Sequence, residues 1–128
     1  MDDLFHAPST PLALPRAYWL NNTLGSQLLL IKPSASAFSR VEDAIGKAKS
    51  DEYDMDIINK LYSKSAMVLP HRPYTILTSE FRHSRNEDHS KWLGESEEVW
   101  DPEKVLREAR HVHFSDWPLS KVCSCHRL

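Results

Sequence analysis

The chain has 128 residues, which is about the length of one domain with a modest core. Hydrophobic residues make up 41% of it and charged residues 27%, an ordinary balance for a globular protein. The net charge of −2, with both signs interspersed, argues against a nucleic-acid-binding surface or a basic membrane-binding surface. The longest apolar run, Leu28–Ile31, is far too short to span a bilayer.

The first residues do not form a signal-peptide pattern, because Met1 is followed by Asp2 and Asp3 instead of basic and then apolar residues. We therefore expect either a cytosolic chain by default or an intact protein that begins elsewhere. Residues 1–19 contain three prolines and no sustained periodicity. They predict an extended segment that follows the surface, anchored by Tyr18 and Trp19.

The next stretch predicts a strand followed by a helix. Gln27–Ile31 is a continuous apolar run, typical of a strand buried on both faces of a mostly parallel sheet. Pro33-Ser34 then opens a helix that Ser34 or Ser36 can cap. Its apolar face is expected to hold Ala37, Phe38, Val41, Ala44, Ile45 and Ala48.

A second helix is predicted within Glu52–Tyr62, where Ile57, Ile58, Leu61 and Tyr62 form one apolar stripe. Asp54 stands where an N-cap belongs, so Asp54 and Asp56 would lie at the positive end of the helix dipole. Two interpretations are open. The carboxylates cap the helix, or one of them is presented to a sugar or a metal.

The rest of the chain continues the alternation of strands and helices. We expect a short strand at Ala66–Leu69, a turn at His71–Tyr74, an extended piece at Tyr74–Thr78, an exposed loop at Glu80–Trp92, a helix that begins at Asp101-Pro102-Glu103 and a strand at His111–Phe114. This alternation predicts a layered α/β fold.

Three stretches in this order resemble the family 8 glycosyltransferases, the glycogenin-like retaining enzymes, and within them the fungal glucose N-acetyltransferase-like branch. The first runs from Met1-Asp2-Asp3-Leu4-Phe5 to Pro15-Arg16-Ala17-Tyr18-Trp19 and is similar to the segment after the family's metal-binding D-x-D. The second comprises Gly25-Ser26-Gln27 to Pro33-Ser34 and then Asp54-Met55-Asp56-Ile57-Ile58-Asn59, which stands where many members carry Asp-Gln-Gly-x-x-Asn. The third, His113–Lys121, is similar to the C-terminal His-Phe…Lys-Pro-Trp signature.

The resemblance implies an α/β fold, the C-terminal part of a Rossmann-like GT-A domain over residues 1–121. It implies transfer of a hexose or N-acetylhexosamine from a UDP-sugar donor to a glycan acceptor, with retention. Asp54 would face the sugar rings as the catalytic carboxylate, and His113 would be a ligand of Mn²⁺. The diphosphate would contact Lys121, whereas Ser26, Gln27, Asp56 and Asn59 would bind the donor sugar. The cation and the lysine would stabilise charge on the leaving diphosphate.

The sequence also departs from the family pattern. The D-x-D and the strands before it are absent, and residues 122–128 do not resemble the expected Pro-Trp ending. We therefore expect a fragment that is inactive alone. The alternative is a non-catalytic remnant that acts by pairing with another chain through an exposed sheet edge. Intact members often work in the Golgi lumen behind an N-terminal anchor, whereas glycogenin is cytosolic, so the compartment stays open.

Simpler roles remain open for several residues. His113 can be a structural histidine and Lys121 a solvated surface charge. The pair His71-Arg72 can touch a phosphate or merely form a turn, and His83 and His89 lack a metal-ligand spacing. A third interpretation is a small metal-binding protein that uses Cys123-Ser124-Cys125-His126.

Overall fold

The computed structural model describes residues 2–6, 8–82, 88–95 and 97–114. The chain falls into two compact units, Met1–Leu69 and Pro70–Leu128, which are described one at a time. Each unit combines helices with a small sheet, so the expected mixed α/β class is confirmed. Among the described residues, no helix is long and apolar enough to cross a membrane.

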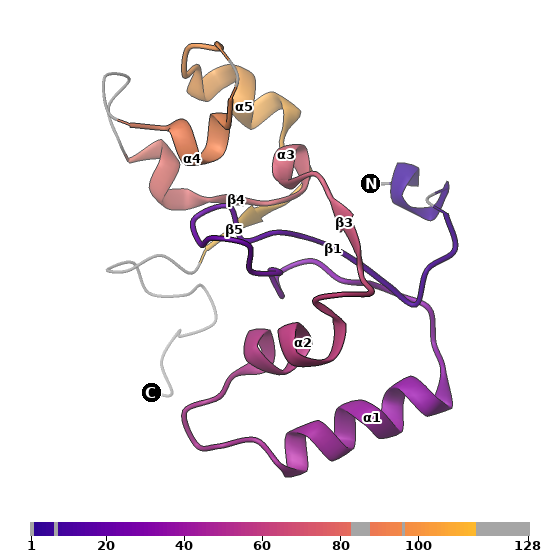
Figure 1. The fold of residues 1–128 in the computed structure, drawn as a ribbon. Coiled ribbons are helices and arrows are strands. Elements are labelled where there is room, and N and C mark those ends of the chain that lie inside the picture. The colour runs from indigo at the N-terminus through magenta and orange to yellow at the C-terminus, as the bar shows by residue number, and fades with distance from the viewer. Residues whose placement is uncertain (1, 7, 83–87, 96, 115–128) are drawn as a thin grey trace, which may run out of the picture. The chain divides into compact units, whose positions relative to one another are not determined.

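The first unit is built on a sheet of three short strands. Its elements are η1 (Asp2–His6), β1 (Leu12–Pro15), β2 (Leu30–Ile31), α1 (Ala35–Gly46), α2 (Asp54–Tyr62) and β3 (Met67–Leu69). The strand order is β2-β1-β3, with β2 antiparallel and β3 parallel to β1. Both helices lie on one side of this sheet, and α2 is the nearer of the two (Figure 1).

The core of this unit gathers around β1, whose four residues are all buried. Leu12 and Leu14 pack with Leu24 and Tyr62, and Leu14 is fully buried. The prediction that residues 1–19 follow the surface is therefore wrong. Because β1 is the middle strand, pairing on both edges and packing of the helices enclose its side chains.

The prediction of a doubly buried strand over Gln27–Ile31 is also wrong. Only Leu30–Ile31 form a strand, and it lies at the edge of the sheet, antiparallel to β1. Ile31 is 57% exposed. Only a strand in the middle of the sheet would bury this apolar run, and the middle position is taken by β1.

Helix α1 begins where the sequence predicted. Ser34 is its N-cap, with extended backbone, and the Ser34 hydroxyl accepts a hydrogen bond of 3.4 Å from the Ala37 N–H. None of its residues is fully buried, however. Phe38 and Ile45, both expected on the inner face, are 64% and 58% exposed. The expected apolar face therefore packs only in part.

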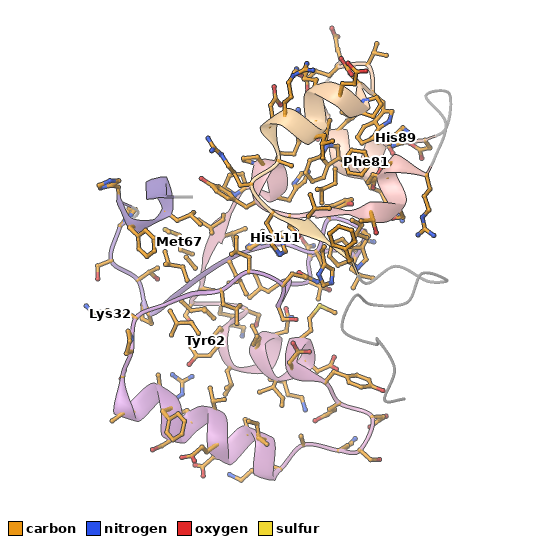
Figure 2. The ribbon with its side chains drawn as sticks, turned by 180° about the vertical axis from the view of Figure 1, so that it is seen from behind. Lys32, Tyr62, Met67, Phe81, His89 and His111 are labelled. Atoms are coloured by element: carbon orange, nitrogen blue, oxygen red, sulfur yellow. The ribbon has the colours of Figure 1, made fainter. Side chains whose placement is uncertain are left out.

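An apolar groove of about 560 Å³ runs beneath α1. Lys32 and Tyr62, labelled in Figure 2, both line it. Its other lining residues are Pro11, Leu12, Leu29, Ile31, Pro33, Ser34, Ala37, Phe38, Val41 and Ile58. The groove is the space that the loosely packed helix leaves open.

The second unit contains two parallel strands and several short helices. Its elements are α3 (His71–Tyr74, interrupted at Arg72), β4 (Ile76–Leu77), η2 (Thr78–Phe81), α4 (Ser90–Leu93), α5 (Pro102–Glu108) and β5 (Val112–His113). The predicted helix start is confirmed, because Asp101 Oδ1 accepts hydrogen bonds from the N–H groups of Glu103 and Lys104, at 3.0 and 3.2 Å. The predicted last strand is confirmed in its middle residues.

The expected exposed loop at Glu80–Trp92 is wrong at its C-terminal end, and residues 83–87 lie outside the described part. His89 is 3% exposed and Trp92 is 2% exposed. His89 Nδ1 lies 2.9 Å from Glu80 Oε2, and the His89 ring stacks on Trp100 at 4.0 Å. Phe81, labelled beside His89 in Figure 2, also packs against Trp100. A polar sequence is buried here because its histidine finds a carboxylate partner and an aromatic face.

An ion-pair network joins α3, the segment before α5 and α5 itself. The Glu98 carboxylate accepts hydrogen bonds from Lys104, at 2.6 Å, and from Arg72. Lys104 first and then Arg72 lower the pKa of Glu98 to about 2. The same contact raises the pKa of Lys104. These charges, of which Glu98 is exposed and the other two are partly buried, link the start of the unit to its last helix.

Candidate functional site

The candidate site begins at the first turn of α2. The helix begins at Asp54 and its N-cap is Tyr53, so the prediction that Asp54 is the N-cap is wrong by one residue. Asp56 Oδ2 accepts a hydrogen bond of 2.9 Å from the Tyr53 N–H, as the third residue of a helix does in half of a capping box. The capping role that the sequence left open therefore belongs to Asp56.

Asp54 remains available for other chemistry. Its side chain is exposed, and it makes no hydrogen bond or ion pair with any residue that the structure describes. Unpaired N–H groups at the start of a helix favour a nearby negative charge. The geometry therefore leaves the Asp54 carboxylate exposed at the start of α2.

Asn59, on the same helix, is tied to a neighbouring segment by its side-chain amide. Asn59 Oδ1 accepts from the Leu24 N–H at 2.9 Å, and Asn59 Nδ2 donates to the Leu24 carbonyl at 2.9 Å. The same Nδ2 donates to the Met55 carbonyl at 2.8 Å, one helical turn earlier. Both amide hydrogens are thus used within the protein, which leaves one acceptor position on Oδ1.

Leu24 leads directly into Gly25, Ser26 and Gln27, so two predicted donor-binding residues follow the residue that Asn59 holds. Gly25 is buried, and a Cβ atom there would lie 2.4 Å from Gln27 Oε1. The Gln27 side chain thus folds over Gly25 in the space that the missing side chain leaves. Gln27 Oε1 is buried and accepts no hydrogen bond from the described part of the chain.

A polar hollow of about 550 Å³ lies along α2, and Asp56 and Asn59 are among its lining residues. The other lining residues are Asp51, Glu52, Lys60 and Ser63. Glu52 Oε1 accepts a hydrogen bond from Lys60 Nζ, which lowers the pKa of Glu52, with a smaller contribution from the Lys49 backbone. The hollow therefore offers carboxyl groups and a lysine, groups that hydrogen-bond hydroxyl-rich ligands.

The predicted metal ligand lies in the second unit. His113 is partly buried on β5, and its ring lies 6.2 Å from the ring of His111. Within residues 2–6, 8–82, 88–95 and 97–114, no group of three His, Cys, Asp or Glu side chains could hold a metal ion. Lys121 and the Cys123–His126 stretch lie outside the described residues, so their predicted roles stay predictions.

The structure gives both His71 and Arg72 local contacts within the second unit. His71 Nε2 lies 2.6 Å from the Trp92 carbonyl oxygen. The Arg72 guanidinium donates to Glu98 and, at 3.4 Å, to the Leu93 carbonyl. Both side chains thus take part in the packing of the second unit, and the phosphate contact stays a prediction.

The first unit brings together part of the predicted site. Asp54, Asp56 and Asn59 share α2, and Asn59 joins them to the segment that carries Ser26 and Gln27. Because Asp54 belongs to the first unit and His113 to the second, the prediction that they face one cleft stays a prediction.

Sequence reasoning missed the role of Leu24 and the pairing of Glu52 with Lys60. Leu24 contacts Asn59 through its main chain. Because every residue has the same main-chain groups, the sequence gives no indication of this contact. The ion pair had a weak signal, since Glu52 precedes α2 and Lys60 lies in its last turn.

Comparison with known proteins identifies relatives that align with most of the chain. A protein named glucose N-acetyltransferase 1 from Gibberella zeae is 47% identical over 127 residues, and one from Aspergillus fumigatus is 43% identical over 134 residues. Each alignment covers 94% of this chain. A protein of the same name from Candida albicans is 28% identical over 79% of the chain. The chain is therefore related to these proteins.

The chain spans 28% of the length of the Gibberella zeae relative and 34% of that from Aspergillus fumigatus. No family model matches the chain, and no solved structure matches it significantly. The relationship thus concerns one region of longer proteins.

Proposed function

We propose that the chain is the C-terminal part of the catalytic domain of a retaining, family 8-type glycosyltransferase with a GT-A fold. Such an enzyme would move a hexose or N-acetylhexosamine from a UDP-sugar to a glycan. The observation that carries the proposal is the 47% identity, over 94% of the chain, with a protein named glucose N-acetyltransferase 1. The mixed α/β fold and the exposed carboxylate at the start of α2 support it.

In this proposal Asp54 is the group that faces the sugar rings. Its exposure and its place in the first turn of α2 leave the carboxylate open to a ligand, so it can stabilise positive charge that develops on the sugar as the bond to the diphosphate breaks. Ser26 and Gln27 would contact the donor sugar. Lys121, outside the described residues, would bind the diphosphate.

A divalent cation, Mn²⁺, would stabilise charge on the leaving diphosphate when bound. The described residues do not make up a complete site for it, because they contain no cluster of three metal-binding side chains. The imidazole of His113 suits one ligand position. We therefore propose His113 as a single ligand of the cation.

The first test measures whether the chain binds ligand alone. Isothermal titration with UDP and Mn²⁺ is expected to show no saturable binding, because the described residues supply only one predicted metal ligand. The full Gibberella zeae protein serves as the control. Tight binding by the chain alone would contradict its proposed inactivity.

The second test places this sequence in a longer protein. The stretch of the Gibberella zeae relative that aligns with the chain is replaced by this sequence, and sugar transfer is measured. The chimera is expected to be active, and Asp54→Asn is expected to lower kcat by about a hundred-fold or more. Asp43→Asn, an exposed carboxylate on α1, is the matched control and should leave kcat within about two-fold. Equal losses in the two variants would contradict the role of Asp54.

A second candidate function, a non-catalytic interaction module, is favoured by the open groove beneath α1. Phe38 and Ile31 line this groove and are 64% and 57% exposed, and β2 lies at the edge of its sheet. Exposed apolar surface next to a strand edge is typical of a protein-binding face. Size-exclusion chromatography with circular dichroism separates the two functions, since a cooperatively melting monomer would count against the interaction module.

A further inference from the structure

The main chain of Leu24 needs partners that β1 does not supply. The residues on either side of Leu24 make two backbone hydrogen bonds of 2.9 Å. The Gly25 N–H donates to the carbonyl of Pro15, the last residue of β1, and the Thr23 carbonyl accepts from the Ala17 N–H just after β1. Because backbone groups alternate in direction along an extended segment, the N–H and C=O of Leu24 point to the opposite side. Leu24 is 1% exposed, so water does not take their place.

The side-chain amide of Asn59 supplies both partners at once. Its oxygen accepts from the Leu24 N–H and its nitrogen donates to the Leu24 carbonyl, each at 2.9 Å, as the peptide group of a neighbouring strand would. The second hydrogen of Nδ2 is held by the Met55 carbonyl. The opposite orientation of the amide would set its oxygen against two carbonyls, so the network itself fixes the assignment.

We propose that Asn59 is a positioning residue of the candidate site. It fixes the turn that begins at Leu24, and so the side chains of Ser26 and Gln27, relative to the first turn of α2 and Asp54. This inference rests on the proposed function, which makes those residues contacts of the donor sugar. In this inference Asn59 acts by holding the turn in place and not by a hydrogen bond to the sugar.

The burial of this contact explains why it can act as a positioning device. Leu24 packs in the core with Leu14 and Tyr62, and Tyr62 is the last residue of α2. The turn and the helix are thus held at two places, by apolar packing and by the amide. Only the amide acts on the main chain immediately before Gly25 and Ser26, so its loss would release the turn while the packing remains.

The first experiment measures amide hydrogen exchange in the full chain by NMR. The Leu24 N–H is expected to exchange as slowly as the N–H groups of β1, although no strand in the described part of the chain pairs with it on that side. Exchange at the rate of an exposed loop amide would overturn the proposal. This measurement uses the unchanged protein and does not depend on any enzymatic activity.

The second experiment removes the amide. In Asn59→Leu, which keeps the volume, the Leu24 N–H is expected to exchange about ten-fold faster or more relative to the Leu14 N–H, and the Ser26 and Gln27 signals are expected to shift. Asn21→Leu, at an exposed asparagine, is the matched control. If Leu24 and Leu14 accelerate equally, the amide contributes only to overall stability and the proposal is overturned.

Asn59→Asp provides a second variant should Asn59→Leu not fold. It keeps an oxygen that accepts from the Leu24 N–H but has no hydrogens for the two carbonyls. We expect protection of the Leu24 N–H to persist and the carbonyl signal of Leu24 to shift. An unchanged Leu24 carbonyl signal would overturn the proposal.

The third experiment is a double-mutant cycle in the chimera described above. Asn59→Asp and Gln27→Ala are each expected to lower kcat/KM by about ten-fold, and the double variant by little more than either, because Asn59 acts through the turn that carries Gln27. Additive losses, or a loss in Asn59→Asp where Gln27→Ala has no effect, would overturn the positioning role. A folded but inactive parent chimera would instead contradict the proposed function, and the exchange measurements would still decide whether Asn59 holds the turn.

Discussion

Strand β1 and helix α1 belong to the same unit but differ greatly in burial. All four residues of β1 are buried, whereas none of the twelve residues of α1 is. The strand lies between β2 and β3, and the helix lies farther from the sheet than α2 (Figure 1). The inner positions of α1 at Ala37 and Ala44 carry short side chains, so an amphipathic pattern alone did not bring the helix into close packing.

This difference in burial indicates which residues contribute most to the stability of the first unit. Burial of large apolar side chains is the main favourable contribution to folding. That contribution is concentrated around Leu14 and Leu24, both at most 1% exposed. Helix α1 contributes through Val41, which packs against the core from a half-buried position. Substitutions in the two elements should therefore have unequal effects.

The largest expected effect is at the centre of β1. Leu14→Ala should lower the free energy of unfolding by about 2–5 kcal/mol, because it leaves a cavity in a fully buried position. Urea denaturation followed by circular dichroism measures the loss. Val41→Ala on α1 is the control and should cost less than half as much. Equal losses would show that α1 is as well packed as β1 and would remove the contrast between them.

The N-cap of α5 provides an intermediate effect for comparison with α1. Asp101→Ala should lower the free energy of unfolding by about 1 kcal/mol, because Asp101 Oδ1 accepts two backbone hydrogen bonds. Asp101→Asn retains an accepting oxygen and should recover most of the loss. The same denaturation measurement applies, and an equal loss in the two variants would contradict the capping role.

The N-cap of α1 should matter less. Ser34→Ala should cost about 0.5 kcal/mol, because the Ser34 hydroxyl accepts one backbone hydrogen bond of 3.4 Å and the helix it caps is only partly packed. Ser34→Thr, which keeps a hydroxyl, is the control. A loss larger than that of Asp101→Ala would show that α1 is held more firmly than its exposure indicates.

The two caps also show which parts of this fold the sequence could predict. Ser34 and Asp101 were predicted because a cap depends on residues that are neighbours in the chain. The central place of β1 was not predicted. It depends on pairing with β2 and with β3, which lies far along the sequence, and a run interrupted by prolines gives no local indication of that pairing.

The candidate site was predictable to a similar extent. The exposed carboxylate of Asp54 at a helix start follows from local sequence, and so does the capping chemistry that Asp56 carries out. The contact of Asn59 with Leu24 does not, because one partner is main chain and the two residues come together only through the fold. The sequence therefore indicated the residue types of the site, whereas the structure gave Asn59 its partner.

The smallest expected effect is at Phe38, which lines the groove beneath α1 and is largely exposed. Phe38→Ser should change the free energy of unfolding by no more than about 0.5 kcal/mol, because the side chain is 64% exposed. Denaturation at two protein concentrations measures this, since self-association would make the stability depend on concentration. A large, concentration-dependent loss would mean that another chain covers the groove beneath α1. The difference in burial between β1 and α1 would then hold only for the monomer, and the interaction module would become the better supported function.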